Sequence, residues 1–152
     1  MSEGRVEAVY IGAEESGPLG EVPEVAALEG KGLEGDRYEH TGDITLIEAE
    51  ALEALAEEHG IQLPAAESRR QVLTRGVRLN PLVGKRFRVG EVECIGAELC
   101  EPCSHLQKLT QPGVLRGLVH RGGLRADILS GGVIRPGDPV AEVPDSAAAP
   151  AP

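Results

Sequence analysis

Two cysteines in the second half of the chain have the type and spacing best suited to chemistry. Cys100 and Cys103 flank Glu101-Pro102, at the end of a strand-like run and before a polar turn. The thiolate of an accessible cysteine is both a nucleophile and a soft metal ligand. Cys103, which directly follows Pro102, is therefore the candidate for an exposed and reactive sulfur. The alternative is a small buried side chain, which is the usual environment of a free cysteine.

The remaining cysteines are predicted to be structural. Cys94 alternates with Val92 on an expected strand and belongs to the core, whereas Cys100 either packs or acts as a resolving thiol. A zinc site formed by Cys100, Cys103 and His105, with or without Cys94, is a further alternative. One Cys-x-x-Cys without a second pair supports it weakly, because a structural zinc ion takes four ligands at recognisable spacing.

An adjacent pair of arginines, Arg69 and Arg70, is the candidate site for an anionic group. Guanidinium groups bind phosphate through paired hydrogen bonds, and Arg75 is placed to assist. The alternative is a solvated surface pair. Three later arginines are expected to face solvent from predicted strands: Arg78, Arg86 and Arg88.

A glycine-rich segment, residues 30–38, has three glycines within six positions. Such a segment allows close approach of the backbone to a ligand, and its amides can surround an anion. The candidate ligand-binding residues in or just after it are Lys31, Asp36, Arg37 and His40. The alternative is a plain turn in which Asp36 caps its own backbone. The segment matches neither a P-loop nor a dinucleotide-binding fingerprint. Further on, His120-Arg121 precedes Gly122-Gly123 and either lines the same pocket or forms a surface turn.

Composition limits the fold and the partners. The chain has 152 residues, 41% of them hydrophobic but only 2% aromatic, so we expect one domain with an aliphatic core. Twenty glycines and eleven prolines favour a β-rich fold with many turns. A net charge of −10 argues against nucleic acid and anionic membranes as partners. With no long apolar stretch, no leader-like start and an odd number of cysteines, we expect a cytoplasmic protein with reduced thiols.

The elements that would position these residues are mostly short strands. Apolar patterns predict strands over 5–11, 21–29, 44–47, 86–89, 92–95, 123–129 and 132–140, with 71–79 as strand or irregular. Helical spacing predicts a helix over 48–59 that ends at Gly60 and begins either with Thr45 and Glu48 as a capping box or a little later. Residues 104–118 are predicted to be partly helical. Gly90-Glu91 fits a type II′ hairpin, and residues 135–138 form a turn. Short strands separated by glycine-rich turns are typical of a barrel.

Taken in order, these features resemble the molybdenum-cofactor sulfurase C-terminal (MOSC) domain family. The matching pieces are residues 32–37, the apolar strand that leads into the helix at Glu48, Arg69-Arg70, residues 76–79, 84–90, Pro102-Cys103 and 131–138. The chain departs from the family at Gln71, where asparagine is frequent. The resemblance implies a mainly β (β-rich α+β) fold, a MOSC-type β-barrel with a few peripheral helices, over residues 1–143. Residues 144–152 are expected to form a disordered Ala/Pro-rich tail.

The resemblance also implies a function. It implies binding of the molybdenum cofactor (molybdopterin), with Cys103 either ligating molybdenum or carrying persulfide sulfur. Arg69 and Arg70 would hold the phosphate end, and the glycine-rich loop around Asp36 would close over the pterin. The implied partners are a sulfur donor or an electron-transfer protein. Two alternatives remain: a reductase component for N-hydroxylated substrates, and a non-enzymatic carrier or zinc-stabilised binding module.

Overall fold

The computed structural model describes residues 4–12, 19–36, 39, 43–100, 113, 117–118 and 120–143. Its strands are β1 (Gly4–Ile11), β2 (Gly20–Val22), β3 (Val25–Leu28), β4 (Gly32–Leu33), β5 (Asp43–Glu48), β6 (Val72–Arg75), β7 (Arg86–Val89), β8 (Val92–Leu99), β9 (Leu124–Ser130), β10 (Gly132–Ile134) and β11 (Pro139–Glu142). Its helices are α1 (Ala49–His59) and two short 3-10 helices, η1 (Ala65–Ser68) and η2 (Asn80–Leu82).

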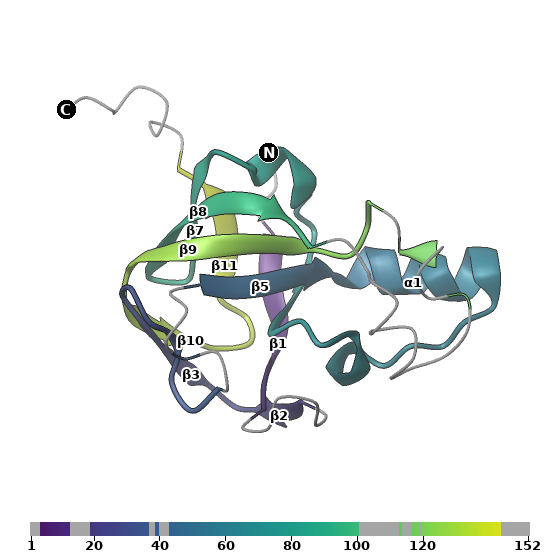
Figure 1. Ribbon diagram of the computed structural model, residues 1–152, viewed down its shortest axis with the longest axis horizontal. Helices are drawn as coiled ribbons and strands as arrows, with labels where there is room; N and C mark the ends of the chain where they lie inside the picture. The colour runs from purple at the N-terminus through teal and green to yellow at the C-terminus, as the bar shows by residue number, and fades with distance from the viewer. Residues whose placement is uncertain are drawn as a thin grey trace.

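Seven strands close into a barrel. Their order is β11-β7-β8-β9-β5-β6-β1, β1 pairs back with β11, and β2 extends the sheet beyond β1. β5 and β6 are parallel because α1 carries the chain between them, and the other barrel pairs are antiparallel. A second sheet, in the order β10-β3-β4, lies on the side of the barrel away from α1 (Figure 1). The predicted β-barrel is confirmed.

The barrel interior is aliphatic, as the composition predicts. Val, Leu, Ile and Ala side chains from most strands form one buried cluster, together with Cys94 and the chain's one phenylalanine, Phe87, which is fully buried. Alternation along each strand directs every second side chain inward. In β1 the pairing register with β6 shifts between Val6 and Ala8, and this bulge allows both Ala8 and Val9 to be buried.

The predicted helix is confirmed as α1, and its end is the one expected. Gly60 has a φ of 67° and donates its N–H to the carbonyl of Ala56, 2.9 Å away. Leu55 packs with Ile61, Leu63 and Leu118 in a second apolar cluster. Of the two predicted starts, the capping box is wrong, because Thr45 lies within β5 and the Glu48 side chain makes no capping hydrogen bond. The later start is confirmed, since α1 begins at Ala49.

Two predicted strands are each divided in two. Residues 21–29 break between β2 and β3 at Pro23, because proline has no N–H for the ladder. Residues 132–140 break at the predicted turn, where Gly137 has a φ of 94°. The hairpin at Gly90 is confirmed, with Val89 opposite Val92 and a φ of 63° at Gly90.

The prediction of a few peripheral helices is met only by α1, η1 and η2 in the part of the chain that the structure describes. The predicted helix over 104–118 falls almost wholly outside the described residues, as does the 144–152 tail. No helix in the described ranges has both the length and the apolar character needed to span a bilayer.

Candidate functional site

The side chain of Arg70 joins three segments at one edge of the barrel. Its Nε donates to the carbonyl of Gly122 at 2.6 Å, just before β9 begins. Its terminal nitrogens donate to the carbonyl of Cys100 at 3.2 Å and to that of Ser68 at 3.3 Å. Cys100 follows the last residue of β8, so this half-buried guanidinium fixes the point at which the chain leaves β8 towards Cys103.

A tight turn before β6 presents Arg70 to this edge. Arg69 is also half-buried and has an interaction partner of its own. It follows η1 with a φ of 66°, in the left-handed region that non-glycine residues seldom adopt. The hydroxyl of Ser68 donates to the carbonyl of Ala65 at 2.6 Å and accepts from the N–H of Arg70 at 3.3 Å. The structure therefore separates the roles of the two arginines, because the Arg70 side chain is hydrogen-bonded to the barrel edge.

The Cys100 backbone is held on both sides. Its N–H donates to the carbonyl of Gly123 at 2.8 Å, and its own carbonyl accepts from Arg70. Burial raises the pKa of the Cys100 thiol, although the nearby charges of Arg70 and Arg125 act in the opposite direction. At neutral pH Cys100 is therefore a neutral thiol, a poor nucleophile and a poor metal ligand.

Cys94 lies in the core, as predicted. It is fully buried, and burial raises the pKa of its thiol to about 12. Six residues along a strand place Cys94 about 20 Å from Cys100, too far for the two to share one zinc ion. Among the described residues, no group of three or more His, Cys, Asp or Glu side chains is arranged to hold a metal. Cys103 and His105 lie outside the described residues.

Asp36 is buried in a hydrogen-bond network of its own. Its Oδ1 accepts from the N–H of Gly12 at 2.9 Å, and its Oδ2 accepts from Nε2 of Gln71 at 2.8 Å. The Oε1 of Gln71 in turn accepts from the N–H of Thr45 at 2.9 Å. Asp36 therefore connects the loop after β1 to β5 and to the residue next to Arg70. In the sequence Gln71 stands out only as a departure from the family, and its place beside the arginine pair is the one signal of this contact.

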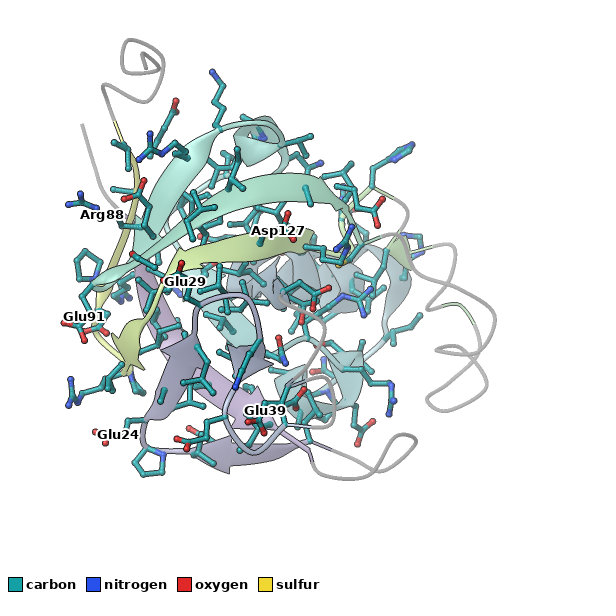
Figure 2. All side chains as sticks on the ribbon, turned by 60° about the vertical axis from the view of Figure 1, so that its left-hand side comes forward. Glu24, Glu29, Glu39, Arg88, Glu91 and Asp127 are labelled. Carbon is teal, nitrogen blue, oxygen red and sulfur yellow. The ribbon has the colours of Figure 1, made fainter. Side chains whose placement is uncertain are left out.

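Lys31 lies elsewhere, on the turn between β3 and β4. It is exposed and lines a shallow groove of about 510 Å³ together with Glu29 and residues 131–133. Figure 2 shows Glu24, Glu29 and Glu91 on this side of the molecule. The structure thus brings Arg70, Cys100 and the Asp36–Gln71 pair to a common region and leaves Lys31 apart. The other two candidates, Arg37 and His40, lie outside the described residues.

A cleft of about 230 Å³ opens beside Gly123. Its walls are mostly polar and come from the start of α1, from residues 78–80 and from residues 120–123. The lining residues are Glu48, Glu50, Ala51, Ala54, Arg78, Asn80, His120, Arg121 and Gly123. From the sequence, His120-Arg121 was open between lining a pocket and forming a surface turn, and both residues line this cleft. No local pattern signals the cleft, because its walls are up to 75 residues apart in sequence.

Comparison with known proteins identifies similar folds. A family model described as the MOSC domain matches residues 36–141. The crystal structure of the YuaD protein from Bacillus subtilis has a TM-score of 0.80 at 15% identity, covering 91% of this chain and 94% of that one. YiiM from Geobacillus stearothermophilus gives 0.71 at 18% identity, covering 92% and 75%, and YiiM from Escherichia coli gives 0.69 at 20%, covering 94% and 70%. No curated protein matches the sequence significantly.

Proposed function

Because this chain belongs to the MOSC domain family, whose members are associated with the molybdenum cofactor, we propose that it binds this cofactor at the barrel edge anchored by Arg70, with Cys103 as the key sulfur. The observation that carries the proposal is the pair of hydrogen bonds from Arg70 to the carbonyls of Cys100 and Gly122. They fix the start of the segment that carries Cys103, three residues further on.

The residues at this edge fit the chemistry of the cofactor. Molybdopterin is anionic and ends in a phosphate, and a guanidinium is the side chain best suited to phosphate. Arg70 uses three of its five N–H groups on carbonyls, which leaves two without a partner among the described residues. When bound, the cofactor supplies a redox-active metal centre, and the chain supplies charge, orientation and one sulfur.

Cys103 is the cysteine best suited to the sulfur role. The pKa values of Cys94 and Cys100 are both raised by burial, which keeps these two thiols protonated. A thiolate at Cys103 serves either as a soft ligand for molybdenum or as a carrier of sulfane sulfur. In the second role it attacks a donor persulfide, takes the outer sulfur and releases the donor thiolate, so no external oxidant is needed.

The test is elemental analysis of the full chain, freshly purified from a host supplied with molybdate. We expect molybdenum, or sulfane sulfur detected by cyanolysis, in the wild type. Both should be lost in Cys103→Ser and retained in the matched control Cys100→Ser. A Cys103→Ser variant that keeps both at the wild-type level contradicts the proposal. Stoichiometric zinc that is lost in Cys100→Ser would instead favour a zinc-stabilised binding module.

A further inference from the structure

The small sheet β10-β3-β4 has an apolar outer face that is open to solvent. Its inner face packs on the barrel, where Val25 and Ile134 are opposite each other and buried in the main core cluster. Because side chains alternate along a strand, Ala26, Leu28 and Val133 lie on the outer face, where each is only half-buried. These three line the shallow groove of about 510 Å³. The outer face is therefore an apolar surface large enough to receive side chains from another molecule.

The charges on this face are balanced. Glu29 and Lys31, the two charged residues that line the groove, lie at the turn between β3 and β4 and are both exposed. Neither side chain makes a hydrogen bond or an ion pair with a described residue. At the other end of the same two strands, Arg135 pairs with Glu24 at 2.8 Å. Two anions and two cations thus share this face, although the whole chain has a net charge of −10.

This balance favours a second copy of the chain over a partner of one charge sign. In a two-fold symmetric contact, the same two positions meet twice with their roles exchanged. Lys31 of each copy can therefore pair with Glu29 of the other, while the apolar residues of the two faces pack together. A strongly basic or strongly acidic partner would satisfy one of these two charges and repel the other.

Long-range charge also selects this face for self-association. Two copies that each carry a charge of −10 repel each other, and the repulsion is smallest where the approaching surfaces are locally neutral. The nearby surface is acidic, with Glu34 and Glu91 both exposed, and Figure 2 shows Glu91 on the same side as Glu24 and Glu29. The groove with its unpaired lysine is therefore the part of this side where like copies approach at the lowest cost.

We propose that this chain forms a two-fold symmetric dimer through the outer face of β10-β3-β4, with reciprocal pairs between Lys31 and Glu29. The face is small, so the dimer is weak, with a dissociation constant of about 1–100 μM. The sheet lies on the side of the barrel away from α1, and Lys31 lies apart from Arg70 (Figure 1). Dimerisation therefore leaves the proposed cofactor edge of each copy open and does not depend on the proposed function.

The experiment is analytical ultracentrifugation of the full chain from about 1 μM to about 1 mM. The wild type should sediment as a 16.0 kDa species at low concentration and approach twice that mass at high concentration. Glu29→Lys and Lys31→Glu each place like charges opposite each other at both contacts. We expect each variant to raise the dissociation constant at least about tenfold.

An equimolar mixture of the two variants is the decisive sample. The new lysine of Glu29→Lys then faces the new glutamate of Lys31→Glu, while the native Lys31 of the first variant faces the native Glu29 of the second. Both pairs are restored, so the mixture should dimerise about as tightly as the wild type. A loss of folding in either variant could not produce this recovery.

Glu57→Lys is the matched control, because it makes the same change of charge on the exposed face of α1 and should dimerise as the wild type does. Thermal melts check that every variant is folded. A wild type that stays monomeric at about 1 mM overturns the inference and leaves the face to a different protein. Single variants that dimerise like the wild type, or a mixture that stays monomeric, also overturn it.

Discussion

Exchanging the hydrogen-bonding groups of Asp36 and Gln71 should break their network in each single variant and restore it in the double variant. In Asp36→Asn, the new amide faces Nε2 of Gln71, so two donors meet where a donor met an acceptor at 2.8 Å. In Gln71→Glu, two carboxylates meet at the same place, while the bond from Thr45 is retained. In the double variant, an amide at position 36 donates to a carboxylate at position 71.

The expected magnitude follows from burial and charge. Asp36 is 5% exposed and Gln71 is 4% exposed, so neither group can replace its lost partner with water. A hydrogen bond to a charged group contributes about 1.5–3 kcal/mol. We therefore expect each single variant to lose about 2–3 kcal/mol of unfolding free energy and the double variant about 1–2 kcal/mol. The coupling energy is then about 3 kcal/mol, the upper end of measured values.

The assay is urea unfolding followed by circular dichroism, because the chain has no tryptophan. The Gln71→Glu variant adds a pH test. The new carboxyl at position 71 touches the Asp36 carboxylate, so repulsion raises its folded pKa above its unfolded value of about 4. The stability that the protonated carboxyl contributes is present at low pH and is lost as the pH rises through its folded pKa. The loss of unfolding free energy in Gln71→Glu, relative to the wild type, should therefore be smaller at pH 5 than at pH 7. The loss in Asp36→Asn should not change in this way. Losses that simply add in the double variant would refute the coupling.

Three further predictions concern the barrel edge and the core. Arg70→Ala should lose about 2–3 kcal/mol of stability by removing three bonds to carbonyls, whereas Arg88→Ala, exposed on β7, should change it by less than about 0.5 kcal/mol in the same assay. Gly123→Ala should lower the melting temperature by several degrees or prevent folding. The added Cβ would lie 2.1 Å from the Leu46 carbonyl oxygen, and the φ of 109° is one that residues with a Cβ rarely adopt. An unchanged melting temperature contradicts this prediction. The pKa of Cys94 is raised from 9.0 to about 12, so the unfolded state loses this proton first and stability falls between pH 9 and pH 12. By pH 10.5 the wild type should lose about 2 kcal/mol more than Cys94→Ala, and equal losses would refute the assignment.

Local pattern was sufficient for most of the fold. Alternating apolar residues predicted β1, β5, β7, β8 and β9, and helical spacing with Gly60 predicted α1 and its end. The near absence of aromatic residues predicted an aliphatic core. These features depend on neighbours within a few residues, or on composition, so the chain alone specifies them. The capping box was wrong because Thr45 lies in β5, where its hydroxyl accepts from the N–H of Gln71 instead of capping the helix.

The candidate site was predictable only as a set of residue types. The sequence singled out Arg70, Asp36 and the cysteines, but not what each one contacts. Closing the barrel brings residues 36 and 71 together, and likewise 70 and 122, so the partner of each buried polar group is decided across separations of 35 and 52 residues.

The sequence by itself determined which groups are available: an adjacent pair of arginines, a carboxylate in a glycine-rich turn, three cysteines and an acidic helix. The tertiary structure decided that Arg70 anchors the backbone at Cys100, that Asp36 accepts from Gly12 and Gln71, and that Glu50 lines the cleft beside Gly123. The physical reason is that a buried polar group must find a partner in space, and only the closed barrel determines which partners lie within reach.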